Sequence, residues 1–428
     1  IRRQRQMCIR DRLQMIQKER LQKDFDAMAQ LTGLGEGINR LAFTDADWEG
    51  RQYIIDRMTD AGLDVEIDEF GNVVGYKVGT NPDLPVVMVG SHTDSVPNGG
   101  NYDGVVGVLS AIEVVRSIID DGFEHDHTIA VVDFMCEESS RFGAATLGSK
   151  AMRGKLTLND LHRLVDKQGV SLYDSLKERK LHPDAIESMA YNRPVKAFIE
   201  MHIEQGKVLE HEQKQIGIVS GIAAPERFYV TICGNADHSG ATPMNLRHDA
   251  LCGASKIILG IEEVTSMQEE PPVVGTVGIA EVVPGAMNVI PGSVKLGVDI
   301  RSISKVARDS VVFLIKELID VIAEKRGLSY TIEPIAQDHP VAMHPAMIRE
   351  IEEAVKSVGV DYMTMPSGAG HDAMHWTEVA PTGMIFIPCR DGISHNPAEF
   401  AAMDDIIAGA EVLENVIKNI SLVSNTLD

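Results

Sequence analysis

The chain of 428 residues carries 40 Lys or Arg against 63 Asp or Glu, which gives a formal net charge of −23. This charge excludes nucleic acids and anionic membranes as expected partners, because both require a basic surface. The composition is 44% hydrophobic and 24% charged, which is typical of a globular protein, and the length predicts two or three domains.

Neither the N-terminus nor the cysteines indicate secretion. Residues 1–12 lack the apolar core of a secretory signal, and we expect them to be a non-native leader, with the native chain beginning near Leu13. The five cysteines are scattered without a CxxC pair, which favours a reducing compartment over a disulfide framework or a thiolate zinc site. No apolar run approaches the roughly 20 residues that span a bilayer, so we expect a cytoplasmic protein.

The first part of the chain is predicted to be an α/β domain. Apolar residues recur at helical spacing up to residue 62, and a further helix is predicted over 105–119. Residues 128–135 form a continuous apolar run, typical of a strand buried on both faces. Alternating strands and helices predict a mostly parallel sheet. The other predicted strands lie at 65–68, 73–78 and 85–89.

A domain of different character interrupts this one. Its predicted order of strand, helix, strand, strand, helix, strand is typical of a ferredoxin-like α+β sandwich. These elements are predicted at 226–233, 248–263, 273–282, 293–300, 305–326 and 329–332. Afterwards α/β features resume, with helices at 345–358 and 404–420 around a strand at 382–387. We therefore predict a catalytic domain in two parts, 13–213 and 334–428, and an inserted domain over 214–333.

Polar side chains that suit a metal ion follow the apolar strand predicted at 85–89. His92 and Asp94 come directly after this strand, and a glycine-rich loop then leads to Asp103. An imidazole and carboxylates suit a divalent cation such as zinc. Asp94 is placed to accept the other N–H of His92 and to fix its tautomer. Taken alone, the segment is also compatible with an ordinary polar turn.

Three further strand ends carry similar donors. Glu137 and Glu138 follow a long apolar strand, His202 ends another apolar run, and His395 lies in a turn after the last predicted strand. Each is a weak indication by itself, since an exposed acidic turn or a structural histidine would have the same pattern. Because adjacent strand residues point to opposite sides, one glutamate can bind metal while the other acts as a general base.

Together, five of these positions predict a metal site, and if Asp103 bridges two ions, the five residues divide evenly between them. One ion would be held by His92, Asp103 and His202. The other would be held by Asp103, Glu138 and His395. Two cations about 3.5–4 Å apart can lower the pKa of a shared water and stabilise a tetrahedral oxyanion. The donor atoms suit Zn²⁺, and Mn²⁺ or Co²⁺ would also bind.

The chain resembles the M20 metallopeptidase superfamily and, within it, the hydantoinase/carbamoylase-type amidases. The resemblance covers about residues 20–425. It rests on Gly90–Asp94, Asn98–Gly104, Glu137–Gly143, His202–Gly206, Gly234–Met244, Pro284–Gly292, Asp299–Ser302, Ser367–Asp372 and Ser394–Glu399. It implies a two-zinc aminopeptidase-like catalytic domain with a mixed sheet, in which Glu137 is the general acid/base. It also implies that the inserted ferredoxin-like domain is a lid through which the chain forms a homodimer.

The resemblance further implies which residues bind the substrate. His238 would reach the neighbouring subunit's site and stabilise the oxyanion, and Gln205 would face the ureido group. Asn288 and Arg301 would hold the substrate carboxylate, which the fork of an arginine binds bidentately. Gly368 and Ala369 belong to a glycine-rich loop that would lie near the same carboxylate. By sequence alone, His238 would be read as a loop residue, Arg301 as a solvated strand end and this loop as a turn.

Two residues depart from the family's pattern and bear on substrate selectivity. Ser139 stands where relatives commonly carry glycine, and Met287 stands where a threonine is common. We expect hydrolysis of an N-carbamoyl-L-amino acid to the amino acid, CO₂ and ammonia. Allantoate amidohydrolase and β-ureidopropionase are the nearest alternatives, and an M20 dipeptidase or a non-catalytic zinc-binding homologue are more distant ones. A non-catalytic homologue would have lost a ligand or Glu137, and this chain has lost neither.

Overall fold

The computed structural model describes residues 16–427, so the expectation about residues 1–12 lies outside the described part. The chain divides into two compact units. The first contains the residues up to Ser220 together with Met343–Met365 and those from Gly370 onward, and the second contains Gly221–Ala342 and Pro366–Ala369. No helix within 16–427 is long and apolar enough to cross a membrane.

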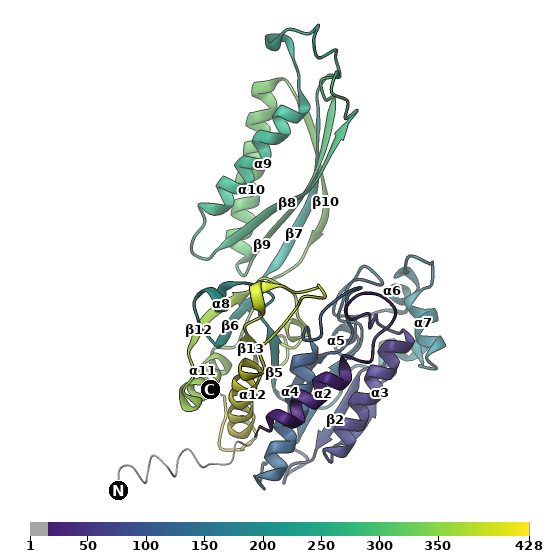
Figure 1. Ribbon diagram of the computed structural model, residues 1–428, viewed down its shortest axis with the longest axis vertical. Helices are drawn as coiled ribbons and strands as arrows, with labels where there is room; N and C mark the ends of the chain where they lie inside the picture. Colours follow the sequence, from purple (N-terminus) through teal and green to yellow (C-terminus); the bar gives the residue numbers. More distant parts are fainter. Residues whose placement is uncertain (1–15, 428) are drawn as a thin grey trace. The chain divides into compact units, whose positions relative to one another are not determined.

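A mixed sheet forms the centre of the first unit (Figure 1). Over the described residues it has nine strands in the order β1-β2-β4-β3-β5-β13-β6-β11, with β12 beside β6. The strands are β1 (Asp64–Ile67), β2 (Val73–Lys77), β3 (Val86–His92), β4 (Ile129–Phe134), β5 (Val195–Ile203), β6 (Ile216–Ile222), β11 (Val341–Ala342), β12 (Tyr362–Ser367) and β13 (Thr382–Ile387). The neighbours β4, β3, β5 and β13 run parallel, which confirms the predicted α/β class.

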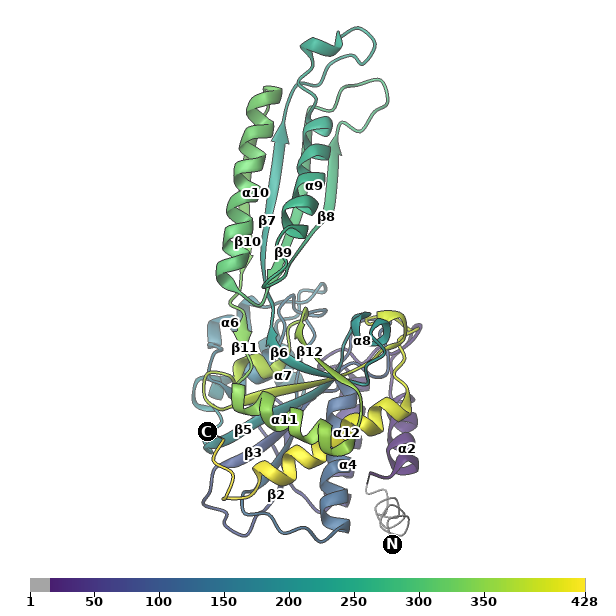
Figure 2. The same ribbon diagram turned by 90° about the vertical axis from the view of Figure 1, so that its left-hand side faces the viewer.

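The core of this unit explains why these strands are so apolar. Alternate strand residues such as Val87, Val89, Ile199 and Met201 are fully buried and pack against a layer of helices. Burial of each such side chain stabilises the folded state by about 1.5–3 kcal/mol. The strands are therefore rigid, and they fix the position of the residues at their ends. The helices are α2 (Lys18–Met28), α3 (Asp45–Asp60), α4 (Val105–Asp120), α11 (Pro345–Val358) and α12 (Met403–Ile420). Figure 2 shows α11 and α12 side by side.

Several elements of the first unit were not predicted. The helices α5 (Leu147–Met152), α6 (Leu158–Arg163) and α7 (Leu172–Glu178) are too short to show a helical repeat of apolar residues. The strand β6 also escaped prediction, because Gly217 and Gly221 interrupt its apolar pattern.

The second unit is a four-stranded antiparallel sheet over the described residues, in the order β10-β7-β9-β8. Its elements are β7 (Ala224–Cys233), α9 (Ala250–Ser266), β8 (Val273–Val283), β9 (Ser293–Ser302), α10 (Lys305–Arg326) and β10 (Ser329–Gln337). The helices α9 and α10 cover one face (Figure 1). On β9, Val294, Leu296 and Val298 face these helices, and the residues between them are half-buried. Chain order and strand order confirm the predicted ferredoxin-like sandwich.

Candidate metal centre

The parallel strands bring the predicted ligands to one edge of the sheet. In the register of the sheet, His92 at the end of β3 lies beside Phe134, the last residue of β4. On the other side, His202 of β5 lies beside Phe386 of β13. The loops that follow β4 and β13 therefore begin next to the two histidines. Glu137 and Glu138 lie on the first of these loops, and His395 lies on the second.

The first cluster consists of His92, Asp103 and His202, all of them buried. Asp103 Oδ1 lies 3.5 Å from His92 Nε2 and 3.2 Å from His202 Nε2. The ligand atoms of the three residues lie within 4.8 Å of one another, close enough to hold one metal ion.

The second cluster consists of Asp103, Glu138 and His395. His395 Nε2 lies 3.3 Å from Asp103 Oδ2 and 3.1 Å from Glu138 Oε1. The His395 side chain is 48% exposed, and its backbone has a φ of 54°, a value uncommon for a residue other than glycine. Asp103 thus presents one carboxylate oxygen to each cluster, which is the arrangement required of a bridging ligand.

Main-chain carbonyls orient both histidines of the first cluster. His92 Nδ1 lies 3.1 Å from the carbonyl oxygen of Asp94, and His202 Nδ1 lies 2.9 Å from that of Ile203. A carbonyl oxygen only accepts hydrogen bonds, so each Nδ1 carries a proton, and in the neutral ring this leaves the lone pair on Nε2. We expected the carboxylate of Asp94 to accept this bond. That expectation was wrong, because the backbone turns after His92 and brings the carbonyl of Asp94 closer than its carboxylate oxygen, at 3.6 Å.

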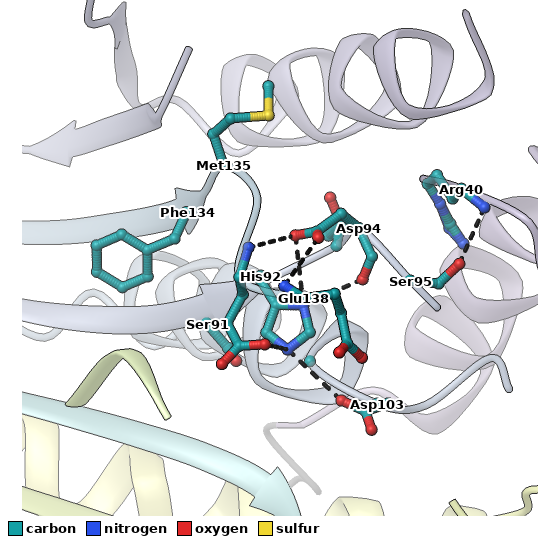
Figure 3. A network of polar contacts seen from close by, with 12 residues as sticks. Arg40, Ser91, His92, Asp94, Ser95, Asp103, Phe134, Met135 and Glu138 are labelled. Atoms are coloured by element: carbon teal, nitrogen blue, oxygen red, sulfur yellow. Dashed lines mark hydrogen bonds and ion pairs between the residues drawn. The ribbon is translucent and has the colours of Figure 1, made fainter. Parts of the chain in front are cut away.

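The carboxylate of Asp94 instead holds the loop that carries the two glutamates. Its oxygens accept hydrogen bonds from the main-chain N–H of Glu137, at 3.0 Å, and of Glu138, at 3.1 Å. Figure 3 shows this carboxylate beside His92 and the segment that follows Met135. Asp94 therefore ties the end of β3 to the loop after β4.

Burial and neighbouring charges shift the pKa values of the carboxyl groups in the site. Burial raises the pKa of Glu137 well above its usual range, and its Oε2 lies 3.8 Å from His92 Nε2. Burial opposes the charge of Asp103 as well, but His202, His395 and His92 hold the pKa of Asp103 well below its usual range. A buried carboxyl group with a raised pKa next to a cation site suits a general acid/base.

Gly104 is required where the glycine-rich loop returns to the strand ends. Its φ is 64°, and a Cβ atom there would lie 2.4 Å from His92 Nε2. Its N–H lies 3.1 Å from His202 Nε2. A side chain at this position would occupy the space between the two histidines and Asp103, so the glycine lets the loop approach them closely.

Two further buried residues that were not predicted from the sequence lie near His202. Glu200 and His371, both buried, form a third set of possible ligands with it. The rings of His371 and His202 meet edge to face with centroids 4.6 Å apart. Glu200 lies on the same strand face as His202, so a carboxylate inside an apolar strand was the signal available in the sequence.

Gln205 lies beside Asp103, the residue shared by the two clusters. Its backbone has a φ of 58°, and its side-chain Nε2 donates a hydrogen bond of 2.6 Å to Asp103 Oδ2. Its Oε1 is buried and has no hydrogen-bond partner among residues 16–427. Buried polar atoms are rarely unpaired in proteins, so this oxygen is free to accept from a ligand.

Two predicted site residues of the second unit, His238 and Asn288, lie close together, at the opposite end of β9 from Arg301. His238 is exposed, and its Nδ1 accepts hydrogen bonds from the N–H of Gly240 and of Ala241, at 3.1 and 3.2 Å. Its Nε2 therefore carries the proton and is a donor. A β-bridge pairs His238 with Val289, next to the exposed Asn288.

Arg301 is held by two neighbours within the second unit. Its Nε and Nη2 donate to the carboxylate of Asp299 at 3.0 and 3.1 Å, and its Nη1 donates to the Gly368 carbonyl at 2.9 Å. In the loop that contains Gly368, the main-chain N–H of Ala369 donates a hydrogen bond of 3.2 Å to Ser367 Oγ. Of the five N–H donors of the guanidinium, these contacts use three, which leaves two for a ligand.

The donors present fit divalent metal ions. Both clusters offer only nitrogen and oxygen atoms, each contains at least one carboxylate, and each includes a histidine with a neighbouring carboxylate. Such sets suit Zn²⁺ and similar ions. The lone pairs of His92 and His202 face the carboxylate of Asp103, which is the orientation that a ligand set requires.

Comparisons with known proteins agree with this chemistry. The sequence matches the group described as Peptidase family M20/M25/M40 over residues 88–419. It is 42% identical over 410 residues to an N-carbamoyl-L-amino-acid amidohydrolase of Pseudomonas sp. (strain NS671), covering 95% of this chain and 99% of that protein. It is 36% identical over 413 residues to a ureidoglycolate hydrolase of Oryza sativa subsp. japonica, covering 95% of this chain and 85% of that protein.

Among solved structures, a hydantoinase/carbamoylase-family amidase from Burkholderia multivorans superposes with a TM-score of 0.90 at 36% identity. The match covers 95% of this chain and 98% of that one.

Proposed function

Since this chain belongs to the peptidase family M20/M25/M40 and, within it, to the hydantoinase/carbamoylase amidases, we propose that it hydrolyses N-carbamoyl-L-amino acids. The bond cleaved is the ureido C–N bond, and the products are the amino acid, CO₂ and ammonia. The observation that carries the proposal is Asp103, which offers one oxygen to each of two ligand clusters beside Glu137. Support for the substrate comes from the 42% identity to an N-carbamoyl-L-amino-acid amidohydrolase.

The clusters would hold two divalent metal ions, with Zn²⁺ the first choice and Mn²⁺ or Co²⁺ as substitutes. One ion would be held by His92, Asp103 and His202. The other would be held by Asp103, Glu138 and His395. When bound, the ions supply Lewis-acid polarisation of the ureido carbonyl and lower the pKa of the attacking water.

Glu137 moves the proton in the reaction. Its carboxylate takes a proton from the attacking water as the new C–O bond forms, and passes it to the leaving amino nitrogen as the C–N bond breaks. The other product, carbamic acid, decomposes to CO₂ and ammonia. Asp94 acts on this step indirectly, because its carboxylate holds the N–H of Glu137 in place.

Residues of the second unit bind the substrate carboxylate and the developing oxyanion. Arg301 keeps two donors for a carboxylate, while Asp299 holds its guanidinium plane. Gly368 and Ala369 lie beside Arg301 in this pocket. Asn288 lies at the opposite end of β9, in the connection between β8 and β9, so it would have to reach this pocket from the neighbouring subunit. The chain acts as a homodimer through the second unit, and His238 of each subunit donates its Nε2–H to the oxyanion in the neighbouring site, a role that fits its protonated Nε2.

Ammonia release from a panel of ureido compounds tests the proposal. The purified protein, loaded with Zn²⁺, Mn²⁺ or Co²⁺, is incubated with N-carbamoyl-L-methionine, N-carbamoyl-β-alanine, allantoate and ureidoglycolate. We expect N-carbamoyl-L-methionine to have the highest kcat/KM, with Gln205 Oε1 accepting from the ureido NH₂. Release from allantoate or N-carbamoyl-β-alanine alone would assign one of those activities instead. No release from any compound with any metal would overturn the proposal.

Ureidoglycolate is the second candidate substrate. The chain is 36% identical to a ureidoglycolate hydrolase across most of both sequences. The two substrates share a ureido group and a carboxylate and differ in the side chain, so a pocket of the same architecture can accept either. A preference for ureidoglycolate in the same assay would select this activity.

A further inference from the structure

Glu399 is a buried carboxylate at the metal centre that neither cluster contains. It is 6% exposed. Its Oε1 accepts hydrogen bonds from the main-chain N–H of Tyr102, at 2.9 Å, and of Asp103, at 3.0 Å. Its Oε2 lies 3.0 Å from Ser394 Oγ. Of these three partners, Asp103 is a predicted metal ligand, and Tyr102 and Ser394 each directly precede one.

These contacts join two loops that are far apart in the sequence. Asp103 lies on the loop between β3 and α4, and His395 lies on the loop between β13 and α12. The Ser394 hydroxyl, next to His395, lies 2.8 Å from Asp103 Oδ2. Glu399 therefore holds Asp103 at its main-chain N–H, and the single hydroxyl proton of Ser394 can be donated to either carboxylate.

Gly100 gives the Glu399 side chain room to lie against the first loop. A Cβ atom at Gly100 would lie 2.2 Å from both Cδ and Oε1 of Glu399. Any side chain at position 100 would therefore displace the carboxylate from the two N–H groups. Only glycine at position 100 lets the Glu399 carboxylate approach the loop before Asp103 closely enough to accept both hydrogen bonds.

We propose that Glu399 is a positioning residue that holds Asp103 where its two oxygens can serve both clusters. The inference rests on the proposed two-metal function and extends it to a residue outside the ligand set. Because Asp103 belongs to both clusters, loss of Glu399 weakens the binding of both ions. Loss of His395 affects only the second cluster.

Zinc binding measured without turnover tests this role. Metal-free protein is titrated with Zn²⁺ in competition with a chromophoric chelator, for the wild type, Glu399→Ala and Glu399→Gln. We expect Glu399→Ala to weaken binding at both sites by about 10–100-fold, the usual effect of removing a residue that supports a ligand. Glu399→Gln should stay within about threefold of the wild type, because its Oε1 accepts both N–H groups and its Nε2 donates to Ser394 Oγ.

Asp68 provides a matched control. Its Oδ1 also accepts from two main-chain N–H groups, those of Phe70 and Asn72, each at 2.9 Å. It lies in the turn between β1 and β2. We expect Asp68→Ala to lower the melting temperature and leave the zinc affinity unchanged. A fall in zinc affinity as large as that of Glu399→Ala would show that losing any carboxylate that holds main-chain N–H groups has the same effect, and would overturn the proposal.

A second variant keeps the test open if Glu399→Ala does not fold. Gly100→Ala leaves Glu399 in the chain but displaces its carboxylate, and should weaken both zinc sites in the same way. Wild-type affinity in Gly100→Ala or in folded Glu399→Ala would overturn the role of Glu399, although the wild type would still bind two ions. A wild type that binds no zinc, Mn²⁺ or Co²⁺ would instead overturn the proposed two-metal function from which the inference starts.

Discussion

The two ligand clusters share Asp103 but differ in how the fold supports their other members. His92 and His202 end buried parallel strands, and main-chain carbonyls fix their rings. Glu138 and His395 lie on loops, and the His395 side chain is 48% exposed with a backbone φ of 54°. A ligand on a packed strand end has few other positions to adopt, whereas a ligand on a loop has several. The comparison predicts a firmly held first ion and a more exchangeable second one.

Removing the shared residue should abolish the difference between the clusters. Asp103→Ala deprives both of a carboxylate, so we expect loss of both ions and a fall in kcat/KM of roughly 10³-fold or more. Metal analysis after gel filtration and ammonia release measure these effects. One retained equivalent of zinc would show that Asp103 does not bridge.

Glu137→Gln should separate catalysis from metal binding. The amide cannot take up the proton of the water, so turnover should fall about 10²–10⁴-fold. Neither cluster includes Glu137, so both ions should remain. Metal content and kcat are measured on the same sample, and retention of more than a few per cent of the wild-type kcat would exclude Glu137 as the general base.

Chelator titration should resolve the two clusters directly. In the wild type we expect one zinc to leave at lower chelator concentration than the other. His395→Ala should bind only the tightly held ion, whereas His202→Ala should lose it. Mass spectrometry under non-denaturing conditions counts the remaining ions. Equal chelator sensitivity of both ions would contradict the comparison of strand-held and loop-held ligands.

Arg301→Ala should have the smallest effect, because it leaves both clusters intact. Loss of hydrogen bonds to a charged carboxylate costs about 1.5–3 kcal/mol, so we expect KM to rise about 10–100-fold with little change in kcat. The control is Arg227→Ala, since Arg227 donates to the same Asp299 carboxylate at 2.8 Å. An equal rise in KM in both variants would place the effect on Asp299 rather than on a substrate contact of Arg301.

The sequence allowed the strand-held part of the site to be predicted better than its supports. Long apolar runs marked the strands that end near His92, Glu137 and His202, and parallel pairing then brought these positions to one edge. The carbonyl acceptor of His92 could not be predicted, because it depends on how the backbone turns after the strand.

The sequence indicated Glu399 only as the last residue of the motif Ser394–Glu399, without a role of its own. Its role depends on two loops separated by almost 300 residues that meet through side-chain to main-chain hydrogen bonds, and no local pattern reports such a contact. The helices α5–α7 were missed for the opposite reason, since each is local but too short for its repeat to be seen.

The carbonyl groups that orient His92 and His202 have a consequence for how this protein tolerates sequence change. Every amino acid supplies a main-chain carbonyl, so the tautomer of each ring does not depend on which side chain stands at positions 94 and 203. Variation at these positions can alter the loop after β4 or the packing of β5, while the nitrogen atoms that face Asp103 keep their lone pairs. The orientation of both rings therefore tolerates a change of side chain at positions 94 and 203, as long as the backbone keeps its path.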